Sequence, residues 1–181
     1  MNISVVIPSY NRIEFLKRSI DSVINQTKKP FEIIVIDDGS TDGTETMIKS
    51  DYDFVKFIKQ KNKGVSAARN IGIKVSIGQW ICFLDSDDEW KIDKLEKQIV
   101  AMKSNPDYKF FHSNEIWMKN GKRINQKKKH KKYGGDIFEK CLDMCRISPS
   151  SVMIDKTIFD EVGNFNEDLV VCEDYELWLR I

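Results

Sequence analysis

The chain has 181 residues, a length that predicts one domain with a substantial hydrophobic core. Hydrophobic residues make up 41% of it, including ten Phe and four Trp, and this composition is typical of a globular protein. No stretch approaches the ~20 consecutive apolar residues that a membrane-spanning helix needs, so we expect a soluble protein.

The start of the chain and its cysteines indicate the compartment. Met1 leads directly into the strand-like segment Ile3–Pro8, without the basic start, apolar core and small-residue cleavage site of an export signal, so we expect a cytoplasmic protein. The four cysteines include no Cys-x-x-Cys pair, and no His lies at metal-ligand spacing from them. This argues against a zinc site and a disulfide framework, and it predicts buried free thiols.

The net charge of +1 conceals an uneven distribution of charge. The segment Lys119–Lys132 contains eight Lys and Arg residues and no Asp or Glu; removing this +8 from the total of +1 leaves −7 on the rest of the chain. Such a run is usually a solvated, mobile loop. The alternative is that it attracts anionic lipid headgroups, which would make the protein peripheral at the inner membrane surface, or a phosphate-bearing substrate.

The first 106 residues predict alternating strands and helices. Short apolar runs that predict strands are Ile3–Pro8, Phe31–Ile36, Val55–Ile58 and Trp80–Leu84. Apolar residues at helical spacing predict helices over Ile13–Ile24, from about Thr44, over Val65–Val75 and over Lys91–Met102, the last with Ile92 on its apolar face. Asn11 followed by Glu14 resembles a capping box at the start of the first helix.

The pattern is less regular after Asn105-Pro106. We expect a strand at Tyr108–Ile116, a loop at Lys119–Lys132, a helix at Asp136–Arg146, a strand at Ser150–Ile154, and short helices at Lys156–Val162 and Asp174–Ile181. The sequence has no internal repeat and no linker rich in Pro, Gly or Ser. It therefore predicts one α/β domain over 1–181, with a Rossmann-like, mainly parallel sheet flanked by helices and a smaller, irregular second half over 107–181.

Acidic and aromatic residues follow the predicted strands, where ligands bind in open parallel sheets. These segments are Pro8–Asn11, Asp37–Ser40 and Asp85–Asp88. No Gly-x-Gly-x-x-Gly follows the first strand and no Gly-x-x-x-x-Gly-Lys occurs, so the chain lacks a dinucleotide fingerprint and a P-loop. Carboxylates at a strand end bind Mg²⁺ or Mn²⁺, which takes one or two of them together with substrate phosphates, so the Asp-x-Asp of Asp85 and Asp87 is a candidate metal–diphosphate bridge.

Five segments in this order resemble the motifs of glycosyltransferase family 2. They are Val5–Asn11, Val35–Asp42, Asn62–Asn70, Phe83–Asp88 and the pair Glu173-Asp174. The resemblance covers essentially the whole chain. It implies the GT-A fold, in which residues 1–106 form a nucleotide-sugar-binding half and residues 107–181 an acceptor-side half.

The resemblance also implies roles for individual residues. Pro8, Ser9, Tyr10, Asn11 and Asp38 would line the base pocket, with the Tyr10 ring packed on the base and the Asp38 carboxylate accepting from the imide N–H of uracil. In the same way Arg69 and Ser86 would contact the nucleotide, Asp85 would meet the ribose hydroxyls, and Asp87 would hold Mn²⁺ or Mg²⁺ on the diphosphate.

On the acceptor side the resemblance implies that Asp174 is the catalytic base, which takes the proton of the attacking acceptor hydroxyl as the anomeric carbon inverts. Ser150, Ser151 and Glu173 would lie beside the acceptor. The implied enzyme transfers a sugar from a nucleoside diphosphate, most simply UDP, to a saccharide or lipid-linked hydroxyl in surface polysaccharide or glycolipid synthesis, with no nucleic-acid partner.

Simpler interpretations exist for each residue. Asp37–Ser40 is also a good turn sequence, and Asp85–Asp88 and Asp174 suit helix starts. Arg69 could be a surface cation and Tyr10 a half-buried aromatic residue at a strand end.

Two rival functions remain open at this stage. Phe83–Asp87 resembles the nucleophile strand of haloacid-dehalogenase-like phosphatases, although Glu89 stands where that motif has Thr or Val and the motif normally follows the first strand. Family 2 members continue beyond the residues that match Glu173-Asp174, whereas this sequence ends at Ile181. We therefore expect an acceptor-side half that ends early, which makes a non-catalytic nucleotide-sugar-binding module the second rival.

Overall fold

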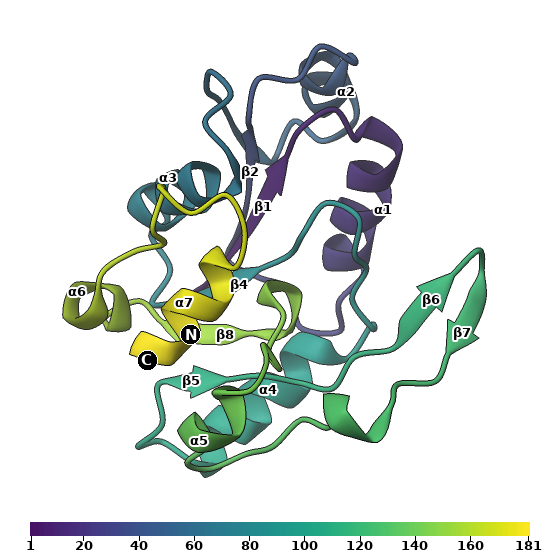
Figure 1. Cartoon of the computed structure of the whole chain (residues 1–181). Helices are drawn as coiled ribbons and strands as arrows, with labels where there is room; N and C mark the ends of the chain where they lie inside the picture. The colour runs from purple at the N-terminus through teal and green to yellow at the C-terminus, as the bar shows by residue number, and fades with distance from the viewer.

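The computed structural model describes residues 1–181 and shows a six-stranded mixed sheet between two layers of helices (Figure 1). The sheet consists of β1 (Ile3–Ser9), β2 (Glu32–Asp37), β3 (Lys56–Lys59), β4 (Trp80–Phe83), β5 (Phe110–Phe111) and β8 (Met153–Asp155). Its order is β3-β2-β1-β4-β8-β5, with the first four strands parallel and β8 and β5 each antiparallel to the preceding neighbour. The predicted α/β fold with a mainly parallel sheet is confirmed.

The register brings the ends of three strands to one edge. β1 pairs with β2 as far as Ser9 opposite Asp37, and it pairs with β4 as far as Val6 opposite Phe83. β2 and β3 lie on one side of β1 and β4 lies on the other, so the strand order reverses at β1. Ligands bind at such a switch point in open α/β sheets.

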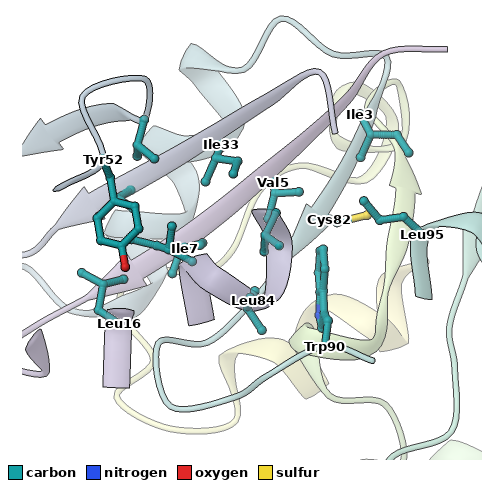
Figure 2. Close-up of a cluster of buried hydrophobic side chains, with 14 of the residues drawn as sticks. Ile3, Val5, Ile7, Leu16, Ile33, Tyr52, Cys82, Leu84, Trp90 and Leu95 are labelled. Carbon is teal, nitrogen blue, oxygen red and sulfur yellow. The ribbon is translucent and has the colours of Figure 1, made fainter. Parts of the chain in front are cut away.

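Alternating residues of β1 face two separate hydrophobic cores. Ile3, Val5 and Ile7 pack with residues of α1 (Ile13–Ile24), α2 (Thr44–Asp51) and α4 (Lys94–Ser104), and Figure 2 shows them facing Leu16, Trp90 and Leu95. Val6 packs on the opposite face with residues of α3 (Val65–Val75), α6 (Ile158–Val162) and α7 (Glu173–Arg180). Burial on both faces explains why these strands read as continuous apolar runs.

Small residues let α3 approach the sheet closely. Ala67, Ala68 and Gly72 lie on its inner side, and a Cβ atom at Gly72 would stand 2.2 Å from Cγ1 of Val6. That distance is far below van der Waals contact, so a larger residue would push the helix away. The close approach fixes the position of Arg69, one turn before Gly72.

The second half differs most from the predictions. The predicted loop Lys119–Lys132 overlaps a hairpin of β6 (Trp117–Lys119) and β7 (Lys122–Ile124), which is followed by the 3₁₀ helix η1 (Lys128–His130). Its turn residues Asn120 and Gly121 have φ values of 51° and 73°, and an Asn-Gly pair is a strong hairpin signal that the interpretation as a loop overlooked.

Three further element predictions in this half were too long. The strand predicted at Tyr108–Ile116 is only β5, and the strand predicted at Ser150–Ile154 is divided into the 3₁₀ helix η2 (Pro149–Ser151) and β8. The helix predicted at Asp136–Arg146 is only α5 (Phe138–Cys141). The guanidinium of Arg146 donates to the carbonyls of Lys129 and Lys140 and to Asp143, so tertiary contacts hold this segment in place of helical bonds.

Some local predictions were also wrong. Asn11 does not cap α1, because its Oδ1 accepts from the N–H of Thr41 (2.8 Å), and Asp42 Oδ2 accepts from the first helical N–H, that of Ile13 (3.0 Å). α4 begins at Lys94, and Ile92 is exposed. Among the thiols, Cys82 and Cys141 are buried as predicted, Cys145 is half-buried and Cys172 is exposed.

Candidate active site

The loop after β1 joins the loops after β2 and β4. The N–H of Asp38 donates to the carbonyl of Ser9 (2.8 Å), and the N–H of Asn11 donates to Ser40 Oγ (2.8 Å). On the other side, the guanidinium of Arg12 pairs with the carboxylate of Asp87. The acids after β2 and β4 therefore flank one loop, as the parallel register predicts.

Within that loop, burial decreases along the chain. Pro8 and Ser9 are buried, and Ser9 Oγ has no hydrogen-bond partner. Tyr10 is exposed, which rules out the half-buried alternative and leaves its ring free to pack on a ligand. Asn11 has a φ of 50°, a left-handed conformation that Asn tolerates better than most residues.

Asp38 is buried and holds a neighbouring loop. One carboxylate oxygen accepts from Gln60 Nε2 and from the N–H of Lys63 (2.8 Å), and the other accepts from the N–H of Gly64 (2.9 Å). A carboxylate has about four lone-pair sites, so these three bonds leave capacity for one more donor. The same bonds fix the loop that leads into α3.

Arg69 connects the end of β4 to the start of α7. Its guanidinium donates to Asp85 Oδ1 and to Glu173 Oε1, each at 2.7 Å, and lies 5.2 Å from the centre of the Phe165 ring. Burial by itself would lower the pKa of Arg69, but the two carboxylates outweigh it and raise the pKa above its ordinary value. Arg69 is 3% exposed, so the surface-cation interpretation is wrong.

Buried hydroxyls hold the turn Asp85–Asp88. Ser150 Oγ accepts from the N–H of Asp85 (3.0 Å) and donates to Asp88 Oδ2 (2.6 Å). Ser19 Oγ on α1 lies within hydrogen-bond distance of the carbonyls of Ser86 (2.9 Å) and Asp88 (2.6 Å). Ser86 and Ser150 are both buried, and the bonds that hold the turn use the Ser86 carbonyl and the Ser150 hydroxyl.

Polar side chains of α1 and of the residues just after it, which were not predicted as part of the site, also support this region. Beside Ser19, Ser22 Oγ accepts from the N–H of Trp90 (3.0 Å), and Gln26 Oε1 accepts from the N–H of Leu95 (3.0 Å). Ser19 and Ser22 on α1 and Gln26 just beyond its end recur at spacings of three and four, and the other buried residues of the helix are apolar. That spacing was the available signal.

Asp87 is the accessible acid of the turn. Its side chain is 46% exposed and already lies against one cation, the Arg12 guanidinium. Burial raises the pKa of neighbouring Asp88, and repulsion from Asp85 and Asp87 adds to the increase, which shows an excess of negative charge here. No three His, Cys, Asp or Glu side chains gather into a protein-only metal site. Mg²⁺ and Mn²⁺ on a diphosphate need only one or two carboxylates, so Asp87 and Asp85 fit that shared kind of site.

Asp174 lies in the first turn of α7, beside Glu173. Its Oδ1 accepts from the N–H of Tyr175 (2.8 Å), and its Oδ2 is 3.8 Å from Cys145 Sγ. Burial raises the pKa of Asp174, and the negative charges of Glu173 and Asp85 add to this. Burial also raises the pKa of the Cys145 thiol, to about 11, so the thiol remains a protonated neighbour.

Two cavities lie in the second half of the chain. The larger, about 960 Å³, runs along β5 and the C-terminal end of α7, and none of the predicted site residues lines it. The smaller, about 150 Å³, is lined by Asp174 and by Glu115, Trp117, His130, Lys132, Cys145, Arg146, Ile147 and Ser148. We place the candidate site at the strand ends and Asp174, because the buried charge network of Arg69 converges there.

Comparison with known proteins identifies relatives of this chain. Residues 4–163 match the family model described as Glycosyl transferase family 2. An uncharacterized glycosyltransferase of Rickettsia felis is 40% identical over 99% of this chain and 30% of its own length. The Escherichia coli protein WfgD, named as a UDP-Glc:α-D-GlcNAc-diphosphoundecaprenol β-1,3-glucosyltransferase, is 34% identical over 99% of this chain and 69% of its own. The chain thus spans about 30% of the length of the Rickettsia relative.

Solved structures share the fold. TarS of S. aureus, residues 1–349 in complex with UDP, superposes with a TM-score of 0.78 over 98% of this chain and 54% of its own, at 21% identity. The mannosyltransferase PcManGT of Pyrobaculum calidifontis, in complex with GDP-Man and Mn²⁺, gives a TM-score of 0.71 over 97% of this chain and 50% of its own, at 16% identity. These neighbours have the GT-A fold.

Proposed function

Because the chain belongs to glycosyl transferase family 2, we propose that its strand-end site transfers a sugar, with inversion, from a nucleoside diphosphate to an acceptor hydroxyl. The observation that carries this proposal is the buried guanidinium of Arg69, which bonds Asp85 after β4 and Glu173 beside Asp174. One side chain thereby joins the proposed donor site to the proposed base. Such convergence of buried charges is typical of functional sites.

On the donor side, we assign the nucleotide to Pro8, Ser9, Tyr10, Asn11, Asp38, Arg69, Asp85 and Ser86. Tyr10 offers an exposed ring to a base, and Asp38 retains acceptor capacity for a base N–H. UDP is the nucleotide to expect, because WfgD is named for a UDP sugar and TarS was solved with UDP. Arg69 and Ser19 keep the Asp85–Asp88 turn in place for the ribose and diphosphate.

Asp87, with Asp85 beside it, would hold Mn²⁺ or Mg²⁺, as the Mn²⁺ bound with GDP-Man in PcManGT suggests. A bound divalent ion would supply Lewis-acid stabilisation of the charge that grows on the departing diphosphate. In the structure, the guanidinium of Arg12 pairs with the carboxylate of Asp87. We propose that Arg12 swings from Asp87 toward the diphosphate when the donor binds.

Asp174 is the proposed base. The acceptor oxygen forms a bond to the anomeric carbon as the bond from that carbon to the diphosphate oxygen breaks, and the acceptor proton passes to Asp174. Its Oδ1 accepts a backbone N–H while Oδ2 has only the weak contact with Cys145, so Oδ2 is the atom we assign to receive the proton. The raised pKa makes this carboxylate a stronger base than an ordinary Asp.

The acceptor side comprises residues 107–181 in this proposal. Ser150 and Ser151 are buried, so we assign them to holding the Asp85–Asp88 turn and Gln98, and Glu173 to positioning Arg69. The acceptor is a saccharide, lipid-linked as in the name of WfgD. No helix has both the length and the apolar character needed to cross a bilayer. We place the protein in the cytoplasm, with Lys119–Lys132 able to meet an anionic membrane peripherally.

A thermal-shift screen of nucleotides tests the proposal. UDP and UDP sugars with Mn²⁺ should raise the melting temperature more than the same compounds with a chelator, and more than ADP with Mn²⁺. At 100 times the dissociation constant, a ligand stabilises the folded state by about 2.7 kcal/mol, which is readily measured. If no nucleotide stabilises the chain, the site assignments fail. The phosphatase alternative requires a phosphorylated Asp85, whereas Asp85 is engaged with Arg69 and the chain belongs to a transferase family.

A further inference from the structure

The cavity beside Asp174 has walls suited to a polar ligand. It measures about 150 Å³, roughly the volume of five waters, and Trp117 and Ile147 are the principal apolar side chains around it. Trp117 is 37% exposed and packs edge-to-face on His130, with ring centres 4.8 Å apart. The cavity is too small for a nucleotide and suits part of one sugar ring.

Glu115 organises the wall opposite Asp174. Its carboxylate accepts from Lys132 Nζ, from Ser148 Oγ (3.0 Å) and from Trp117 Nε1 (3.1 Å), so it ties three separate segments together. Burial opposes its ionisation, but Lys132 and these hydrogen bonds lower the pKa of Glu115 below its ordinary value. The wall is therefore preorganised and keeps Trp117 beside the cavity.

The other basic residues near this wall have no acidic partner. Of the eight Lys and Arg residues in Lys119–Lys132, only Lys132 makes a salt bridge. Lys127, Lys128, Lys129 and Lys131 are exposed and flank His130, which itself lines the cavity. Four exposed lysines without an ion-pair partner next to a cavity-lining His130 make a strong local attraction for an anion.

We propose that this cavity is the acceptor subsite and that it takes one sugar ring bearing an anomeric phosphate or diphosphate. The ring packs on Trp117 with a hydroxyl toward Asp174, and the phosphate faces the lysines of 127–131. This inference rests on the proposed function and adds the acceptor class. The partial positive charge on the sugar C–H groups suits the negative face of an indole ring. The phosphate would provide the negative charge that pairs with the lysines.

Binding of N-acetylglucosamine 1-phosphate, measured by ligand-observed NMR without nucleotide, tests the proposal. Trp117→Ala should weaken binding about tenfold or more, equivalent to about 1.4 kcal/mol, whereas Trp117→Phe should retain most of it. Phe138→Ala is the matched control, because Phe138 is also an exposed aromatic residue and it lines the larger cavity but not the smaller one. It should bind like the wild type. Equal affinity of Trp117→Ala and Phe138→Ala would overturn the assignment.

Charge is tested with a triple variant, Lys127→Gln/Lys128→Gln/Lys129→Gln. This variant should bind the sugar phosphate more weakly than the wild type, and the difference should shrink in high salt. Its binding of uncharged N-acetylglucosamine, which is weaker to begin with, should be unchanged. A control with Lys28, Lys91 and Lys103 changed to Gln removes three exposed lysines that make no ion pair elsewhere, and it should have no effect. Inorganic phosphate that binds as tightly as the sugar phosphate would contradict a role for the ring.

The outcomes separate this inference from the proposed function. If UDP with Mn²⁺ stabilises the chain but the sugar phosphate does not bind, the acceptor subsite is wrong and the donor site stands. If the lysine variant no longer binds phosphatidylglycerol vesicles yet binds the sugar phosphate normally, the lysines bind a membrane surface. Their proposed role in binding the acceptor phosphate is then wrong. Loss of sugar phosphate binding in both Trp117→Ala and the lysine variant, with nucleotide stabilisation intact, supports it.

Discussion

Replacing Asp174 with Asn should lower the rate of sugar transfer by about 10²- to 10⁴-fold, the usual contribution of a general base. The amide has nearly the same shape as the carboxylate, but it does not accept the proton of the attacking hydroxyl. Donor binding should be unchanged, because Arg69, Asp85 and Asp87 remain in place. The measurement is release of UDP from a UDP sugar with acceptor, alongside a thermal shift with UDP and Mn²⁺.

The pH dependence of the wild type gives a second readout of the same residue. Burial, followed by the charges of Glu173 and Asp85, raises the pKa of Asp174 above its ordinary value of 3.8. A base works only when deprotonated, so kcat/KM should fall as the pH decreases through this raised pKa, at a higher pH than an ordinary Asp would give. The control is Asp168→Asn, an exposed carboxylate in the loop before α7. If Asp174→Asn retains full turnover, Asp174 is not the base; if the wild type binds UDP but turns nothing over, the chain is a binding module.

Replacing Arg69 with Met should lower the free energy of unfolding by about 3–5 kcal/mol, because it leaves two carboxylates without their buried partner. The side chains of Arg69 and Glu173 are 4% and 12% exposed, so water has little access to the contact between them. Arg69→Lys should recover only part of the loss, since one ammonium cannot donate along two fixed directions as the guanidinium does.

Urea unfolding at neutral pH measures this effect, with Arg18→Met as the control. Arg18 also pairs with a carboxylate, Glu89, but both side chains are largely exposed, so its removal should cost about 1 kcal/mol or less. Glu173→Gln in the Arg69→Met background should restore part of the stability by removing one unpaired charge. If Arg69→Met lowers the free energy of unfolding no more than Arg18→Met does, the contact between Arg69 and Glu173 does not stabilise the fold.

The first half of the fold was predictable because its signals are local. Continuous apolar runs that end in Asp-rich turns predict the parallel strands. The parallel register by itself then brings the segments after β1, β2 and β4 together. The helix over Val65–Val75 has the same bounds in the structure. The contact between Arg69 and Glu173 joins residues 104 positions apart, and no periodicity predicts it.

The second half was less predictable because tertiary contacts decide its conformation. The segment predicted as a helix at Asp136–Arg146 is held by Arg146, which bonds to Lys140 and Asp143 within the segment and to the carbonyl of Lys129 in another one. The cavity beside Asp174 depends on Glu115, which binds Trp117, Lys132 and Ser148 from three segments. Only the Asn120-Gly121 turn was a local signal, and it predicts the hairpin that carries Trp117.

We propose that Asp87 and Asp85, after β4, hold a divalent ion on the diphosphate of a nucleotide whose base lies at Asp38, after β2. Calorimetric titration of UDP into the chain, with Mn²⁺ and with a chelator, tests this most directly when repeated on Asp87→Asn and on the control Asp93→Asn, a carboxylate that pairs with Lys97 just before α4. We predict that Mn²⁺ tightens UDP binding by about tenfold or more in the wild type and in Asp93→Asn, equivalent to about 1.4 kcal/mol, and that Asp87→Asn loses this gain. Equal UDP affinity with and without Mn²⁺, or an undiminished gain in Asp87→Asn, would contradict the account.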